Sequence, residues 1–242
     1  MNPAGKIPSC ENQACMRDEG EMLISYVSVK GGSGKTSLSV AHAGWAFDNG
    51  FGSVGFLDAD YQKLGSLWLA KAEPRIEVRQ ATTPAEVEKH LKALLAKHDI
   101  VIADGPGGLD RQNVVLIKHA ALCIIPVMAS PLDVHSAYAG AKQLIHAIAK
   151  RHGRTQAVRF VVNGLDNRTD LAKKIRGFAT RMDPPAAKHT VRRLIDIVKA
   201  SDLSKPQIPT RMPLAREARA DLGALFTELM QLVPKQKRAQ ND

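Results

Sequence analysis

The sequence predicts an α/β fold, with a doubly wound, mostly parallel sheet and helices on both faces. Short, nearly continuous apolar runs alternate with helix-length amphipathic segments, as in parallel strands that are covered on both faces. The connections between successive runs are long enough for crossover helices, which is typical of βαβ units. Polar motifs follow the apolar runs directly, and ligands of such sheets bind beyond the carboxyl ends of the strands.

The apolar runs that we expect to be strands are rich in β-branched residues. They are 23–29, 53–57, 76–79, 100–103, 122–127 and 159–162, with 76–79 at an edge of the sheet. The expected helices are 36–49, 84–97, 131–151, 170–182, 186–200 and 213–233. Within 186–200, an apolar stripe with i, i+3, i+4, i+7 spacing predicts a buried helix face. Its members are Val191, Leu194, Ile195 and Val198.

The length of 242 residues is that of one large domain, which we expect to span 22–233. Residues 1–21 are polar and lack periodicity, so they predict a mobile N-terminal extension. Residues 234–242 form a polar tail.

The net charge of +10 belongs to one part of the chain. Residues 1–150 hold 15 basic and 15 acidic side chains, whereas residues 151–242 hold 19 basic and 9 acidic ones. A neutral part joined to a basic part indicates two separate tasks. The basic helical portion, 151–233, favours a polyanionic partner.

Several classes of protein are excluded by composition. The longest nearly apolar run, 120–129, is about half the roughly 20 residues of a membrane-spanning helix, and the N-terminus lacks the apolar core of a secretory signal. Three cysteines are too few for a disulfide framework, and Cys10 and Cys15 lack the second pair or nearby histidine of a zinc site. We therefore expect a soluble, cytoplasmic protein.

A glycine-rich segment after the first expected strand carries the strongest signal. It consists of Lys30, Gly31, Gly32, Ser33, Gly34, Lys35, Thr36 and Ser37. Glycines let successive N–H groups point at phosphate oxygens, and the following helix adds its dipole. In this loop Lys35 would reach the β- and γ-phosphates and Thr36 would ligate Mg²⁺. The usual first glycine is replaced by Val29, and a second lysine, Lys30, begins the loop.

Carboxylates follow the next two central strands. Asp58 and Asp60 are two residues apart at a strand end, so they point to the same side, towards the predicted nucleotide. We expect Asp60 to position the attacking water, and Asp58 to help hold the loop and the metal shell. Asp104 follows a run of apolar residues, which is the pattern of a Walker B aspartate that holds the Mg²⁺ hydration shell. The segment 105–108, Gly-Pro-Gly-Gly, is expected to respond to a γ-phosphate as switch loops do.

Together these motifs resemble the ParA/MinD family of deviant Walker A ATPases, over roughly 22–233. The segments that carry the resemblance are 30–36, 58–62, 104–106 and 125–133. It implies a P-loop NTPase fold, ATP and Mg²⁺ as cofactors, and slow hydrolysis that a partner protein stimulates. It also implies an ATP-dependent homodimer in which Lys30 of each subunit touches the phosphates of the other. Asn163 and Pro209 occupy the places where the family contacts adenine, so the resemblance adds them to the nucleotide site.

The resemblance is most specific for the short partition ATPases that lack an N-terminal helix-turn-helix domain. These imply a centromere-binding, ParB-like partner and an association with the nucleoid. Tyr61 departs from the family, which has proline at this place, and 183–207 match its pattern poorly. Another cargo- or conjugation-positioning ATPase of the family remains an alternative. A MinD-type membrane-associated ATPase is a weaker one, because the tail 234–238 has no apolar anchors.

The basic portion predicts sequence-independent binding to double-stranded DNA, because too few acids are present to neutralise it. Only 11 aromatic residues are present, without a stacking motif, which disfavours single-strand or RNA recognition. Solvated helix faces are the alternative reading of each basic cluster. The candidate DNA contacts are Lys173, Lys174, Arg176, Arg181, Lys188, Arg192, Arg193, Arg216 and Arg219.

Overall fold

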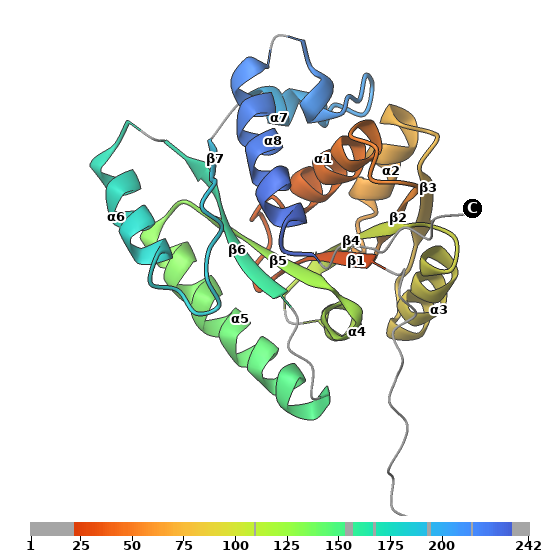
Figure 1. Cartoon of the computed structure of the whole chain (residues 1–242), viewed down its shortest axis with the longest axis horizontal. Helices are drawn as coiled ribbons and strands as arrows, with labels where there is room; N and C mark the ends of the chain where they lie inside the picture. Colours follow the sequence, from red (N-terminus) through yellow and green to blue (C-terminus); the bar gives the residue numbers. More distant parts are fainter. Residues whose placement is uncertain are drawn as a thin grey trace, which may run out of the picture.

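The computed structural model describes residues 22–108, 110–152, 157–166, 168–192, 195–213 and 215–233. Its centre is a seven-stranded sheet in the order β3-β2-β4-β1-β5-β6-β7, and all six neighbouring strand pairs run parallel (Figure 1). The strands are β1 Met22–Ser28, β2 Val54–Asp58, β3 Glu77–Gln80, β4 Ile100–Gly107, β5 Leu122–Met128, β6 Ala157–Leu165 and β7 Val191–Arg192. The predicted fold class is confirmed, and β3 lies at an edge as expected.

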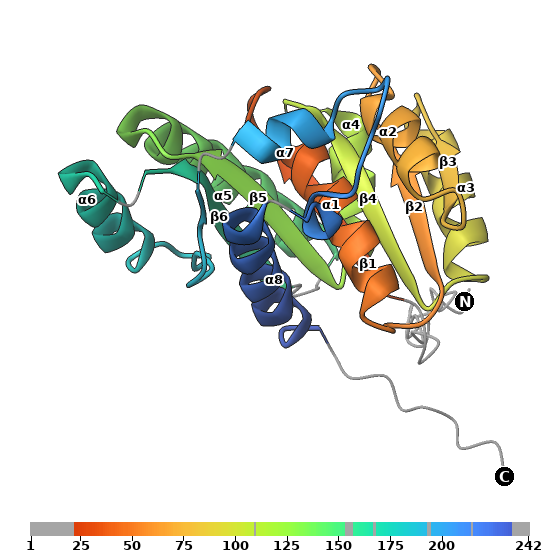
Figure 2. The same cartoon turned by 90° about the horizontal axis from the view of Figure 1, so that it is seen from above.

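Helices cover both faces of the sheet. They are α1 Lys35–Asp48, α2 Leu64–Ala72, α3 Pro84–Leu95, α4 Arg111–His119, α5 Pro131–His152, α6 Asp170–Ala179, α7 Ile195–Ala200, the 3₁₀ helix η1 Pro209–Arg211 and α8 Arg216–Met230. Helices α1, α2, α7 and α8 pack on one face, and α3, α4, α5 and α6 on the other (Figure 1). Seen from above, α6 and α3 lie at opposite ends of the sheet (Figure 2).

Residues of β1, β2 and β5 are almost entirely buried, which explains why their sequences read as continuous apolar runs. The buried residues form one apolar cluster on each side of the sheet. Among the described residues, no helix is both long and apolar enough to cross a membrane.

Helix α1, which follows the glycine-rich loop, is fixed by a buried aromatic cluster. His42 lies parallel to the Phe226 ring of α8, with 4.4 Å between ring centroids, and its Nδ1 is 2.8 Å from the Tyr26 hydroxyl of β1. Burial lowers the pKa of His42 to about 3, so this imidazole is neutral and serves the core. Helix α1 is therefore held against both the sheet and α8.

The predicted helix 186–200 is wrong. Residue Ala186 forms an isolated bridge with Phe160, β7 follows at Val191–Arg192, and only α7 is helical. The apolar spacing that suggested a single helix was accidental, because Val198 is 65% exposed while Val191 is buried in a strand. Leu194 lies outside the described residues.

Helices α2 and α4 were missed by the sequence patterns. Helix α2 begins after Lys63, a residue with positive φ of 56°, which no cap signal marks. Helix α4 has only nine residues and follows a glycine-rich segment. Both helices border the predicted site.

Candidate nucleotide site

The predicted phosphate loop joins β1 to α1 at the carboxyl edge of the sheet. Gly32 and Gly34 have positive φ of 75° and 87°, which other residues rarely adopt. Gly34 is the N-cap of α1, so Lys35, Thr36 and Ser37 form the first turn, whose amides lack intrahelical partners. The loop thus offers backbone donors and a helix N-terminus to an anion.

Asn163, at the end of β6, lies against this loop. Its side-chain amide donates to the Ser33 carbonyl at 3.0 Å. A Cβ atom on Gly34 would lie 2.1 Å from the same amide nitrogen, so the loop and β6 fit only with glycine here. Ser33 and Lys35 are both buried, with 6% exposed. Asn163 therefore supports the loop itself, and its contact with adenine stays a prediction.

Pro209 is not brought to Asn163. The preceding Ile208 packs on Gly44 of α1, where a Cβ atom would lie 2.5 Å from the Ile208 Cγ2. Gly44 is ten residues beyond Gly34, which is about 15 Å along the helix. The two residues predicted to contact adenine thus lie beside different parts of α1, and the role of Pro209 also stays a prediction.

Asp58, at the end of β2, and Asp104, in the carboxyl half of β4, are register partners, and β4 is the neighbour of β1. Both side chains are fully buried. A Cβ atom on Gly65 of α2 would lie 3.2 Å from Asp104 Oδ2 and 3.4 Å from Asp58 Oδ2. The two carboxylates and the phosphate loop therefore converge at three adjacent strand ends, with α2 closing over them.

Burial disfavours the charged form of Asp104. Burial raises its pKa to about 7, the charge of Asp58 adds to the rise, and Thr36 and Lys35 offset it only in part. Neither carboxylate oxygen has a hydrogen-bond partner of ordinary geometry among the described residues. A buried, unpartnered carboxylate beside a hydroxyl is a suitable half-site for Mg²⁺, which typically combines one or two carboxylates with phosphate oxygens and water.

Metal binding by the protein alone is not supported. Among the described residues, no group of three or more His, Cys, Asp or Glu side chains could hold an ion. A cation at Asp104 and Thr36 would take its remaining ligands from a nucleotide and water, as Mg²⁺ does in phosphoryl-transfer sites.

The loop after β2 uses its carboxylates to fix its own shape. Asp58 Oδ1 accepts from the Asp60 amide at 3.1 Å, and Asp58 Oδ2 accepts from the Ser66 amide at 2.7 Å. Asp60 Oδ1 accepts from the Gln62 amide at 2.9 Å. Burial raises the pKa of Asp58, although these hydrogen bonds oppose the rise. Asp58 therefore positions the loop, whereas Asp60 is partly exposed at its turn.

Lys30 lies on the open side of the phosphate loop. Its side chain is 52% exposed and pairs with Asp133, in the first turn of α5, at 3.5 Å. A pocket of about 230 Å³ lies between the start of the phosphate loop and the end of β5, and both residues line it. The second lysine thus faces outward, while Lys35 is buried.

Most of the predicted switch segment 105–108 is strand, because β4 continues to Gly107. Its response to a γ-phosphate stays a prediction. The Gly108 amide donates to the Ser28 carbonyl at 3.1 Å, and a Cβ atom on Gly107 would lie 3.3 Å from Gly31 Cα. The buried Asn113 of α4 donates to the carbonyls of Pro106 and Gly108, at 3.0 and 2.7 Å. The segment therefore lies directly against the phosphate loop.

The model of the VirC1 protein family matches residues 21–162, more than half of the chain. The chain belongs to the VirC1 protein family. Protein VirC1 of Rhizobium radiobacter is 32% identical over 122 residues, which cover 48% of this chain and 52% of that protein. The chain spans only about half the length of the curated VirC1 relatives it matches.

Solved structures share the fold at low identity. A putative plasmid partition protein of Borrelia burgdorferi B31 bound to AMPPNP has a TM-score of 0.65 at 13% identity, covering 88% of this chain and 98% of that one. MinD of Pyrococcus horikoshii OT3, complexed with Mg-ADP, has a TM-score of 0.64 at 19% identity, covering 87% and 96%. This member of the VirC1 family thus has the fold of the ParA/MinD ATPases, as its motifs predicted.

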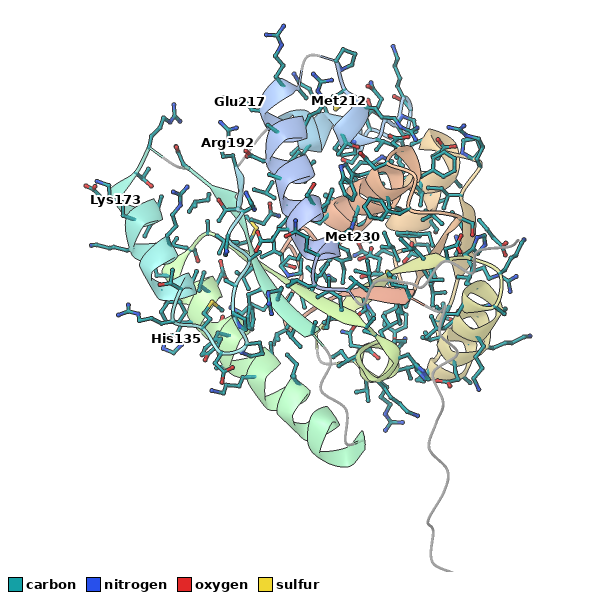
Figure 3. All side chains as sticks on the ribbon, in the orientation of Figure 1. His135, Lys173, Arg192, Met212, Glu217 and Met230 are labelled. Carbon is teal, nitrogen blue, oxygen red and sulfur yellow. The ribbon has the colours of Figure 1, made fainter. Side chains whose placement is uncertain are left out.

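The basic residues of this VirC1-family chain do not form the helix face that was predicted. Arg192 lies on β7, and its guanidinium pairs with Asp221 at 2.8 Å and with Glu217 at 2.9 Å on α8 (Figure 3). Its charge is therefore paired within the protein, which argues against a DNA contact at Arg192, and that contact stays a prediction. Arg193 lies outside the described residues.

The remaining candidates lie on separate elements. Lys173 points away from α6 and pairs with Asp170 at 3.2 Å (Figure 3). The exposed Lys188 precedes β7, and its amide, with that of His189, donates to Glu228. The others are Lys174, Arg176 and Arg181, on α6 or directly after it, and Arg216 and Arg219, on α8.

Sequence patterns missed several residues around the site. The two carboxylate loops are supported by residues that belong to no recognisable motif, namely Asn113 and Gln112 of α4, Gly65 of α2 and Lys63. Lys63 donates to the carbonyls of Asp58, at 3.2 Å, and of Ala81. The only available signal was their nearness in sequence to Asp58 and Asp104, since the packing that unites them is tertiary.

Proposed function

We propose that the chain is a partition-type ATPase that binds ATP and Mg²⁺, dimerises in the ATP state and binds double-stranded DNA without sequence preference. The observation that carries the ATPase proposal is the convergence of the phosphate loop with two buried carboxylates. For one of them, Asp104, the described residues offer no hydrogen bond of ordinary geometry. The two fold neighbours bind AMPPNP and Mg-ADP, which supports this proposal.

In the proposed reaction, water attacks the γ-phosphorus and ADP leaves with the β-phosphate oxygen. The amides of 31–37 and the Lys35 ammonium would hold the phosphates. Thr36 and Asp104 would hold Mg²⁺, which would supply positive charge beside the phosphate oxygens. Asp60 positions the water and contributes to the metal shell, and Asp58 maintains the loop that carries Asp60. The burial of Lys35 and Asp104 strengthens these interactions by excluding water.

Dimerisation is proposed from Lys30. Its exposed ammonium pairs with Asp133 at the surface, and exposed ion pairs of this kind are weak. Breaking this pair costs little, so Lys30 is available to a phosphate on a second subunit. Hydrolysis and the departure of phosphate would remove that contact, and a ParB-like partner would accelerate the step.

DNA binding is proposed for the basic portion. The arginines that support it best are Arg216 and Arg219, one turn apart on α8. A cation in the first turn of a helix opposes the helix dipole, so Arg216 does not serve helix stability. Exposed arginines of this kind are suited to phosphate contacts. The fold does not distinguish one cargo from another, so another cargo- or conjugation-positioning role remains the second candidate.

The test is nucleotide binding followed by DNA binding. Lys35→Ala should lose at least 100-fold in ATP affinity by calorimetry, whereas the exposed Lys89→Ala on α3 should match the parent. The parent should bind a random duplex with ATP and Mg²⁺ but much less with ADP, and Lys35→Ala should not respond to ATP. Equal ATP affinity in Lys35→Ala and the parent would refute the ATPase proposal, and binding to anionic vesicles without DNA binding would favour the MinD-type alternative.

A further inference from the structure

Tyr61 follows Asp60 directly, and its hydroxyl connects the loop after β2 to α4. The hydroxyl donates to Asp110 Oδ2 at 3.0 Å and accepts from Gln112 Nε2 at 2.8 Å. Tyr61 is 58% exposed, so burial does not explain its position. These two hydrogen bonds hold it.

Both partners of Tyr61 are themselves fixed. Asp110 is the N-cap of α4, and Gln112 is buried, with its amide also donating to the Thr82 carbonyl at 2.8 Å. The Gln112 amide therefore uses both of its donors on neighbouring loops. The next residue, Asn113, is the one that holds the carbonyls of Pro106 and Gly108.

The first turn of α4 thus contacts both carboxylate loops. One side reaches the loop of Asp58 and Asp60 through Tyr61. The other side reaches the segment after Asp104 through Asn113. A shift of either loop must break hydrogen bonds to α4 or move its first turn. Breaking those of the buried Gln112 and Asn113 is costly, because a buried polar group left without a partner destabilises the fold.

We propose that Tyr61 is a positioning residue that couples the water-positioning loop of Asp60 to the γ-phosphate-sensing segment 105–108, through Asp110 and Gln112. This proposal rests on the proposed ATPase function. When the segment against Gly31 responds to the γ-phosphate, α4 and Tyr61 place the Asp60 loop at the same time.

The experiment compares Tyr61→Phe, which removes only the hydroxyl, with Tyr138→Phe. Tyr138 is a matched control, because its hydroxyl also makes two hydrogen bonds, to the carbonyl and amide of Asp183, away from the site. Steady-state hydrolysis gives kcat and KM for ATP. Hydrogen exchange of peptides covering 58–63 and 104–113 is measured without nucleotide and with Mg²⁺ and a non-hydrolysable ATP analogue.

We expect Tyr61→Phe to lower kcat about tenfold with KM for ATP changed less than twofold, and Tyr138→Phe to change neither. Without nucleotide, both peptides should exchange at least threefold faster in Tyr61→Phe. With the analogue, 104–113 should regain protection while 58–63 should not. Gln112→Met should have the same effect, and the double variant should be no worse than either single one.

The coupling is overturned if both peptides behave as in the parent, or if Tyr61→Phe raises KM with kcat unchanged, which would make Tyr61 a nucleotide-binding residue. A parent that binds no ATP would refute the proposed function instead. The exchange measured without nucleotide would then still test the link between the two loops. Thermal unfolding of each variant shows whether a loss of activity is only a loss of folded protein.

Discussion

The two ends of the sheet use charged residues in opposite ways. At β2, β4 and β1, Lys35, Asp58 and Asp104 are buried, and the part of the chain that the structure describes gives the Asp104 oxygens no hydrogen bond of ordinary geometry. At β6 and β7, the charged side chains lie near the surface and are paired. Arg192 pairs with two acids on α8, and Arg168 pairs with Asp166, in the turn after β6. Unpaired burial costs stability, so the first arrangement indicates a ligand, whereas the second is explained by folding alone.

The largest expected effect at the first end concerns Asp60. Asp60→Ala removes the carboxylate that positions water, so hydrolysis should fall at least 100-fold while ATP affinity stays within about threefold. The ATP-bound dimer should then accumulate, which light scattering with ATP and Mg²⁺ would detect. Asp99→Ala, which removes a carboxylate on the loop before β4, is the control. Normal turnover by Asp60→Ala would remove Asp60 from the reaction.

Substituting Asp104 should stabilise the ligand-free protein. Asp104→Asn removes a buried charge but keeps the shape, so in EDTA at pH 8 the free energy of unfolding should rise by about 2 kcal/mol. Because the folded-state pKa is raised to about 7, protonated Asp104 favours folding at low pH, and this contribution is lost as pH rises from about 4 through 7.

The gain from Asp104→Asn should therefore be small at pH 5 and large at pH 8, which urea unfolding at both values would measure. Addition of ATP and Mg²⁺ should stabilise the parent more than the variant, since the variant lacks the metal ligand. A variant less stable than the parent at pH 8 would mean that the folded protein stabilises the charged Asp104 carboxylate. The two ends of the sheet would then not differ in how they treat buried charge.

The first end was the more predictable one from sequence. Its strands are continuous apolar runs. Asp58 and Asp104 follow two of these runs directly, and Lys35 follows the third after the glycine-rich segment, so local pattern and chemistry agree. At the second end, the residues around Val191 have helical spacing but form a two-residue edge strand, whose pairing with β6 no local signal reports. The sequence predicts Arg192 as a DNA contact because no local pattern reveals its acidic partners, which lie 25 and 29 residues later on α8.

Reversing charge at Arg216 and Arg219 tests whether any part of the second end is more than structural. Arg216→Glu with Arg219→Glu should weaken binding to a random duplex about tenfold at 0.1 M salt. The slope of log affinity against log salt should fall by about 2, one unit for each lost phosphate contact. Lys89→Glu with Lys92→Glu, on α3 at the opposite end, changes net charge equally and should lower the affinity much less. Equal losses in both pairs would indicate a general charge effect and no local site.

The smallest expected effect on DNA binding is that of Arg192. Arg192→Ala should change the affinity less than twofold, because Glu217 and Asp221 already neutralise the guanidinium. It should instead lower the free energy of unfolding by about 1–2 kcal/mol, since Asp221, with a side chain 16% exposed, loses two charge-assisted hydrogen bonds. Glu217→Gln, at the exposed partner, should cost less than about 0.5 kcal/mol. If Arg192→Ala weakened DNA binding tenfold and left unfolding unchanged, the ion pairs would be incidental, and β7 would belong to the DNA surface.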